Sequence, residues 1–192
     1  LGPLGCGYVT GSGTVFNTLK PEPGSTIAVF GTGAVGLAAM MAGRISGCTR
    51  VIAVDIVPDR LKLAKELGAT DTINSKDEDP VKAIQDLTDG YGVDYAVDTT
   101  GVTSVMEASI KALAQGGTTA TIAVTDQHVD LDTWNDLCVS DRKVVGVNMG
   151  DSIPQVDIPR LIRFYKLGLF DFDKTEKFYK FDDINQANAD SV

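Results

Sequence analysis

The stretch TIAVFGTGAVGLAAMMAGRIS, residues 26–46, decides the fold. It begins with a continuous apolar run, residues 26–30, rich in the β-branched residues typical of a strand that is buried on both faces. Residues 31–36 match the pattern Gly-x-Gly-x-x-Gly, and an Ala- and Met-rich segment of helical composition, residues 34–46, follows. A strand, a glycine turn and a helix in this order predict the first unit of a nucleotide-binding parallel sheet.

The three glycines of this turn have separate expected roles. Gly31 makes the tight turn, Gly33 lets a pyrophosphate approach the backbone, and Gly36 allows the helix to pack closely against the strand. The helix that starts at Ala34 presents free N–H groups and a partial positive charge to the phosphates. The pattern is common by chance, and a turn with a purely structural role stays open as the alternative.

An acidic residue, Asp55, ends the next apolar run, residues 51–55, about 20 residues beyond the glycines. A carboxylate at this point accepts hydrogen bonds from the adenosine ribose and repels a 2′-phosphate, so the sequence favours NAD over NADP. Asp55 can instead be a helix cap before Pro58. A methyltransferase also uses a glycine loop and an acid on its second strand, but this glycine spacing suits a dinucleotide better.

Apolar runs of strand length alternate with amphipathic stretches of helix length along the rest of the chain. We expect further strands near residues 70–73, 93–98, 118–124 and 143–149. Further helices are expected near residues 58–67, 80–87, 102–113 and 159–167. This order predicts an α/β fold with a doubly wound, six-stranded parallel sheet of the Rossmann type, in one dinucleotide-binding domain over residues 1–192.

Composition and charge disfavour several kinds of partner. The 192 residues carry 26 acidic and 17 basic side chains, and a net charge of -9 repels nucleic acids and anionic lipid surfaces. The most apolar stretch, residues 27–43, is interrupted by glycines and is shorter than a membrane span. Three widely spaced cysteines without a Cys-x-x-Cys pair indicate a reducing compartment, so we expect a cytoplasmic protein.

Three motifs together resemble the coenzyme-binding domain of the zinc-dependent medium-chain alcohol dehydrogenases. They are LGCGYVTGSGTVFNT at residues 4–18, VFGTGAVGL at residues 29–37 and AVDIVPDRLKLAKELGAT at residues 53–70. The segments 150–174 and 177–191 are most similar to the aryl-alcohol (benzyl-alcohol) dehydrogenase branch. The resemblance implies NAD-dependent oxidation of a primary, aromatic alcohol. It also implies that this chain, which starts at Leu1 without an initiator Met, is a fragment that lacks the N-terminal zinc-binding catalytic domain.

The resemblance also implies roles for single residues. Cys6 would be one ligand of the catalytic zinc, Thr10 would lie near the nicotinamide, and Val35 would pack against its ring. Asp55 and Arg60 would hold the adenosine ribose. The other implied cofactor contacts are Gly31, Gly33, Ala34, Gly36, Thr99, Thr100, Ile122, Val124 and Met149. Since the other zinc ligands lie outside the chain, we expect it to retain no Zn²⁺ and to oxidise no alcohol by itself.

Two rival functions differ in class from this interpretation. One is a free-standing NAD-binding sensor module, and the other is a zinc-free, NADPH-dependent reductase of the same superfamily. Cys6 argues against both, although it can also be a small residue packed beneath a glycine turn, and Asp55 argues against the second. The single histidine, His128, lies in an expected loop with no catalytic pattern around it, and we assign Cys48 and Cys138 to packing. The Tyr-x-x-x-Lys pair of short-chain dehydrogenases does not occur.

Residues 129–133 alternate apolar and polar side chains from Val129 to Thr133, as a short edge strand does. In the resembled family this segment corresponds to a strand that pairs across a two-fold axis. An unpaired edge strand favours such pairing. We therefore expect a homodimer that forms through this segment.

Overall fold

The computed structural model describes residues 2–190, and within them six strands form one parallel sheet. The strands are β1 (Thr26–Phe30), β2 (Arg50–Asp55), β3 (Asp71–Asn74), β4 (Val93–Asp98), β5 (Leu113–Thr121) and β6 (Lys143–Gly146), in the order β3-β2-β1-β4-β5-β6. The order reverses between β1 and β4, so the switch point of the sheet lies at the carboxyl ends of these two strands. The predicted doubly wound α/β fold is confirmed.

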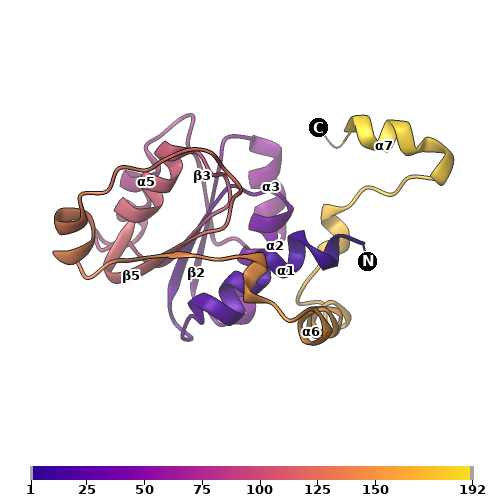
Figure 1. Ribbon diagram of the computed structural model, residues 1–192, viewed down its shortest axis with the longest axis horizontal. Helices are drawn as coiled ribbons and strands as arrows, with labels where there is room; N and C mark the ends of the chain where they lie inside the picture. The colour runs from indigo at the N-terminus through magenta and orange to yellow at the C-terminus, as the bar shows by residue number, and fades with distance from the viewer. Residues whose placement is uncertain (1, 191–192) are drawn as a thin grey trace.

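Helices cover both faces of the sheet (Figure 1). The helices α2 (Ala34–Ile45) and α3 (Pro58–Glu66) pack on one face, and α4 (Pro80–Leu87) and α5 (Thr103–Lys111) pack on the other. In β1, Ile27 and Val29 contribute to the first of these cores, whereas Ala28 and Phe30 contribute to the second. This is why the run that decides the fold is apolar at every position rather than at alternate ones.

A third cluster joins α1 (Gly7–Gly13) to α2 and to α6 (Pro154–Lys166). Its buried members are Leu4, Tyr8, Val9, Ala38, Met41, Leu161, Phe170 and Phe172. The chain continues from α1 into π-helical turns at Thr14–Leu19, and short 3-10 turns lie at Gly2–Gly5, Met149–Asp151, Phe172–Thr175 and Phe181–Asp183. The last helix, α7 (Ile184–Asp190), lies away from the sheet (Figure 1). No helix within residues 2–190 has the length and hydropathy that a bilayer crossing requires.

Several element boundaries differ from the sequence-based expectation. The strand β5 starts at Leu113 and ends at Thr121, so residues 122–124 lie beyond it. Residues 116–117, which we expected to end a helix, lie inside β5 at an irregularity in its pairing with β4. Gly116 has φ +77° there. The helix α6 begins at Pro154 rather than at Pro159, since the Asp157 side chain accepts a hydrogen bond from the Ile153 N–H (2.8 Å) and secures the earlier start.

The strand expected at residues 129–133 is not present. Residues 127–132 belong to no helix or strand, and π-helical turns follow at Thr133–Cys138. The Asp132 side chain accepts hydrogen bonds from the N–H groups of Trp134 and Asn135, both at 3.1 Å, and so starts these turns. The alternating pattern does not produce a strand here, because no strand among residues 2–190 offers this segment the ladder hydrogen bonds that a strand requires.

Candidate functional site

A cleft of about 830 Å³ opens at the carboxyl ends of β1, β2 and β4, which is where an open α/β sheet binds its ligands. Its lining residues are Phe30, Gly31, Gly33, Ala34, Val35, Val54, Asp55, Ile56, Arg60, Ser75, Asp79, Pro80, Thr99, Thr100, Val102, Ser104, Val105 and Ala108. Eight of the residues predicted from sequence therefore line one cavity: Gly31, Gly33, Ala34, Val35, Asp55, Arg60, Thr99 and Thr100.

The glycine turn between β1 and α2 is fixed by close contacts. Gly31 has φ +85°, and a Cβ atom there would lie 2.5 Å from the Thr99 Oγ1 atom. A Cβ on Gly36 would lie 1.9 Å from the Gly31 carbonyl oxygen, whereas a Cβ on Gly33 would meet no atom within 4 Å. The first and third glycines thus permit the turn and the close helix packing, and Gly33 leaves room against the backbone for a ligand.

Thr99, which follows the end of β4, binds the glycine turn through its hydroxyl group. Its hydroxyl donates to the carbonyl oxygen of Phe30 at 2.9 Å and to that of Gly31 at 3.2 Å. Its side chain therefore locks the glycine turn, a role that the sequence did not suggest for it. The helix that starts at Ala34 spans twelve residues, and its first turn lines the cleft with free N–H groups and the positive end of the helix dipole.

Asp55 ends β2 at the side of the cleft, with only 7% of its surface exposed. Its Oδ2 atom accepts hydrogen bonds from the backbone N–H (2.6 Å) and the hydroxyl (2.8 Å) of Thr32. Its Oδ1 atom accepts from the N–H groups of Ile56 (2.7 Å) and Val57 (3.0 Å). Burial works to raise the pKa of the Asp55 carboxyl, but these hydrogen bonds outweigh burial, so the pKa lies below its ordinary value.

A second acid, Asp98, ends β4 and was not singled out from the sequence. It is fully buried, and its Oδ1 atom accepts from the N–H (2.9 Å) and the hydroxyl (2.7 Å) of Thr100, while Oδ2 accepts from the Gly101 N–H at 3.3 Å. Asp98 therefore shapes the turn that carries Thr100 into the cleft. The signal for it was present, because the runs VIAVD and VDYAVD both end in Asp at the same edge of the sheet.

Sequence reasoning also missed the walls of the cleft. Ile56 is 49% exposed and Val102 is 51% exposed, so two aliphatic side chains present apolar surface at a cavity that also holds Asp55. An apolar slot beside a carboxylate suits a flat, partly apolar group such as a purine base. The segment from the end of β3 to the start of α4 also lines the cleft, through Ser75, Asp79 and Pro80. No sequence motif in this segment indicates that it lies near the glycine turn.

Of the residues expected around the nicotinamide, Val35 lines this cleft, whereas Thr10, Ile122, Val124 and Met149 do not. The Thr10 hydroxyl lies 3.8 Å from the sulfur of Met149, and Met149 itself is 43% exposed and has φ +52°. Val124 is fully exposed, and Ile122 follows the end of β5. Val35 lies between the cleft and α1. It lines the cleft, and its carbonyl oxygen packs so closely on Gly11 of α1 that a Cβ atom there would lie only 1.9 Å away.

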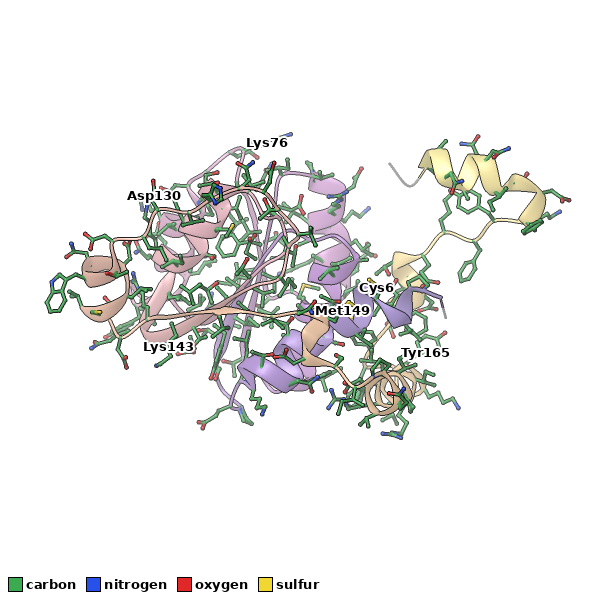
Figure 2. All side chains as sticks on the ribbon, in the orientation of Figure 1. Cys6, Lys76, Asp130, Lys143, Met149 and Tyr165 are labelled. Atoms are coloured by element: carbon green, nitrogen blue, oxygen red, sulfur yellow. The ribbon has the colours of Figure 1, made fainter. Side chains whose placement is uncertain are left out.

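Cys6 lies exposed at the N-terminal end of α1, the helix that contacts the turn at Met149–Asp151 (Figure 2). Among residues 2–190, no group of three or more His, Cys, Asp or Glu side chains is arranged to hold a metal ion. Cys48 is buried as expected, and burial raises the pKa of its thiol to about 11. Cys138 is exposed, so its assignment to packing is wrong, because the turns at Thr133–Cys138 have no core beneath them.

Comparison with known proteins identifies the family. The family described as zinc-binding dehydrogenase matches residues 34–166, a range that starts at α2 and includes Asp55, Thr99 and Thr100. The chain belongs to the zinc-binding dehydrogenase family. Among curated relatives, the geraniol dehydrogenase of Castellaniella defragrans is 38% identical over 189 residues, which are 97% of this chain and 50% of that protein. Alcohol dehydrogenase 1 of Trifolium repens is 37% identical over 96% of this chain and 49% of its own length.

Solved structures of zinc-binding dehydrogenases agree with this membership. Benzyl alcohol dehydrogenase from Acinetobacter calcoaceticus superposes with a TM-score of 0.95 at 45% identity, covering 100% of this chain and 53% of that one. An alcohol dehydrogenase zinc-binding domain protein from Burkholderia ambifaria gives a TM-score of 0.93 at 49% identity, with 100% and 52% covered. This zinc-binding dehydrogenase chain thus spans about half the length of the curated relatives it matches.

Proposed function

We propose that this chain is the coenzyme-binding domain of an NAD-dependent zinc alcohol dehydrogenase. The observation that supports this function best is the cleft at the switch point of the sheet, with the glycine turn on one side and the Asp55 carboxylate on the other. The donor set fits a dinucleotide: Gly33 leaves space against the backbone, and the N-terminus of α2 offers N–H groups to a pyrophosphate. NAD supplies the hydride acceptor when it is bound.

The two sides of the cleft have different proposed tasks. The turn from Gly31 to Gly36 receives the pyrophosphate, and Ile56 and Val102 enclose the adenine. Asp55, ionised at neutral pH, faces the adenosine ribose and repels a 2′-phosphate. Arg60 lines the same cleft and has no ion-pair partner among residues 2–190. The combination favours NAD over NADP.

Isothermal titration calorimetry of the 192-residue chain with NAD⁺ and NADP⁺ tests this proposal. We expect NAD⁺ to bind weakly but measurably and NADP⁺ to bind more weakly still. Asp55→Ser removes the charge that opposes the 2′-phosphate, so it should narrow or reverse the preference. Equal affinities for the two dinucleotides, or tighter NADP⁺ binding by the unmodified chain, would contradict the role given to Asp55 and would favour the rival NADPH-dependent reductase.

We further propose that the whole enzyme oxidises a primary, aromatic alcohol to its aldehyde. Support comes from the benzyl alcohol dehydrogenase structure, which is 45% identical over the whole of this chain and 53% of that one. In such an enzyme Cys6 would be one of three protein ligands of a catalytic zinc, the others coming from a catalytic domain outside this chain. The zinc would act as a Lewis acid on the alcohol oxygen.

Cys6→Ala in the complete protein tests the zinc assignment. We expect turnover to be lost and zinc content to fall, while NAD⁺ affinity stays nearly unchanged, because Cys6 lies outside the cleft that receives the dinucleotide. The 192-residue chain itself should contain no stoichiometric zinc after purification. Normal turnover of the variant would show that Cys6 is not the ligand. One tightly bound zinc per 192-residue chain would contradict the proposal that the other ligands lie outside this chain.

A cytoplasmic homodimer completes the proposal. The edge strand β6 leaves one row of backbone groups unpaired, and residues 129–133 alternate between partly buried apolar and exposed polar side chains. A second copy would supply the ladder partner that this segment lacks within one chain. Light scattering at tens of micromolar should give the mass of two chains, and the fluorescence of Trp134, which is 67% exposed, should change with concentration.

A further inference from the structure

The Asp55 carboxylate has no free acceptor site. Within residues 2–190 it accepts four hydrogen bonds: two at Oδ2, from the N–H and the hydroxyl of Thr32, and two at Oδ1, from the N–H groups of Ile56 and Val57. An ionised carboxylate offers about four acceptor positions on its two oxygens. A ribose hydroxyl that approaches Asp55 therefore has to compete with one of these four donors.

Three of the four donors are backbone N–H groups, which cannot move away from Asp55 without a change in the backbone conformation. The Thr32 N–H follows Gly31, whose φ of +85° is required by the turn into α2. The N–H groups of Ile56 and Val57 lie between β2 and α3, where the Val57 carbonyl oxygen accepts the first bonds of α3. The Thr32 hydroxyl is the exception, because it can rotate away about its own side-chain torsion.

We propose that Thr32, which is buried behind the cleft lining and bonded to Asp55, determines coenzyme specificity, because its hydroxyl competes with the adenosine ribose for Asp55. The inference rests on the proposed NAD-binding function. It separates two effects of Asp55: the negative charge, which repels a 2′-phosphate and which Thr32 leaves in place, and the hydrogen bond to a ribose hydroxyl, which Thr32 weakens. NAD carries a 2′-hydroxyl that can donate to Asp55, whereas NADP carries a phosphate at that position.

Burial strengthens the competition. Thr32 is 1% exposed and Asp55 is 7% exposed, so water does not readily take the place of either partner. The charge of Asp55 also persists, since the same hydrogen bonds hold the pKa of its carboxyl below the ordinary value. In the present sequence Asp55 therefore rejects NADP by charge but holds NAD with less than its full hydrogen-bonding capacity.

Thr32→Val tests the inference, because valine keeps the shape of threonine and lacks only the hydroxyl. The variant leaves three donors on Asp55 and opens one position at Oδ2. We expect the dissociation constant of NAD⁺, measured by calorimetry, to fall about fivefold, the value of one net hydrogen bond, and that of NADP⁺ to change by less than about twofold. Thr32→Ser, which keeps the hydroxyl, should retain the affinities of the unmodified chain.

A matched control is Thr119→Val, which removes another buried threonine hydroxyl. The Thr119 side chain is 2% exposed on β5 and pairs with the Ser109 hydroxyl at 3.0 Å, outside the cleft. This variant should lower stability without changing either dissociation constant. Thr32→Val should also lower stability, since it removes a hydrogen bond to a buried carboxylate, yet it should bind NAD⁺ more tightly. A merely structural Thr32 would instead lose stability and affinity together.

The results distinguish this inference from the function on which it rests. If the unmodified chain binds NAD⁺ but Thr32→Val binds it equally or more weakly, the competition is overturned and the coenzyme function stands. If the unmodified chain binds no NAD⁺, the proposed function fails and the inference fails with it. Tighter binding of both NAD⁺ and NADP⁺ by Thr32→Val, in equal proportion, would also overturn it, because the hydroxyl would then have no effect on selectivity.

Discussion

The two ends of the proposed coenzyme site differ in how far this chain completes them. At the adenosine end, Asp55 and the glycine turn lie in a cavity of about 830 Å³ whose polar groups are held by their own hydrogen bonds. At the nicotinamide end, Met149 is 43% exposed and Val124 is fully exposed. Under the proposed function, the sheet alone supplies the adenosine end, whereas the nicotinamide end requires further surfaces beside α1 and the turn at Met149.

The packing that supports the adenosine end gives the largest expected effect. A Cβ on Gly36 would lie 1.9 Å from the Gly31 carbonyl oxygen, so Gly36→Ala forces α2 away from β1. We expect a loss of about 3 kcal/mol in the free energy of unfolding, measured with urea, and no detectable binding of NAD⁺. Unchanged stability of Gly36→Ala would mean that the glycine turn can relax around the added methyl group. The adenosine end would then not be held rigidly by its own packing.

Gly33→Ala is the matched control within the same turn. Its Cβ would meet no atom within 4 Å and its φ is -71°, so stability should change by less than about 1 kcal/mol. Affinity for NAD⁺ should nevertheless fall, because the methyl group occupies the space where the pyrophosphate approaches. Gly36→Ala therefore tests the packing that supports the site, and Gly33→Ala tests the space that the pyrophosphate would occupy.

The fold and the residues that line one side of the cleft could be predicted because their sequence signals are local. Continuous apolar runs predict strands that are buried on both faces, and the glycine turn, α2 and Asp55 follow one another within about 25 residues. The rest depends on contacts between distant segments. Ser75, Asp79 and Val102 reach the cleft only through the order of the sheet, and the residues after β5 leave the strand earlier than their apolar pattern suggests.

The charge of Asp55 gives an effect of intermediate size that depends on pH. The pKa of this carboxyl is lower in the folded chain than in the unfolded one, so its contribution to stability is present above the unfolded value, near pH 4, and is lost as pH falls through the folded value. In Asp55→Asn, an amide N–H₂ group replaces one carboxylate oxygen, and this group cannot accept hydrogen bonds from the backbone N–H donors. We expect this variant to be less stable than the unmodified chain by about 1–3 kcal/mol at pH 7.

Urea unfolding at pH 7, 5, 4 and 3 measures this dependence. The stability difference between the unmodified chain and Asp55→Asn should shrink once the pH falls below about 4, as the carboxyl takes up its proton. Asp89→Asn is the control, since Asp89 is an exposed turn residue with φ +53°, a conformation that asparagine also adopts. A difference that stays constant down to pH 3 would mean that the hydrogen bonds, rather than the charge, carry the effect.

The smallest expected effect lies at the nicotinamide end. Because Thr10, Ile122, Val124 and Met149 do not line the cleft, the nicotinamide ring should gain little from this chain, and ADP-ribose should bind within about twofold of NAD⁺, a difference below about 0.5 kcal/mol. Met149→Ala should change neither affinity measurably in calorimetry, since its side chain contacts the Thr10 hydroxyl and otherwise lies partly exposed. NAD⁺ binding ten times more tightly than ADP-ribose would show that the nicotinamide end is already formed here. The same comparison in the complete enzyme should give a clear preference for NAD⁺, because the surfaces that enclose the ring are then present.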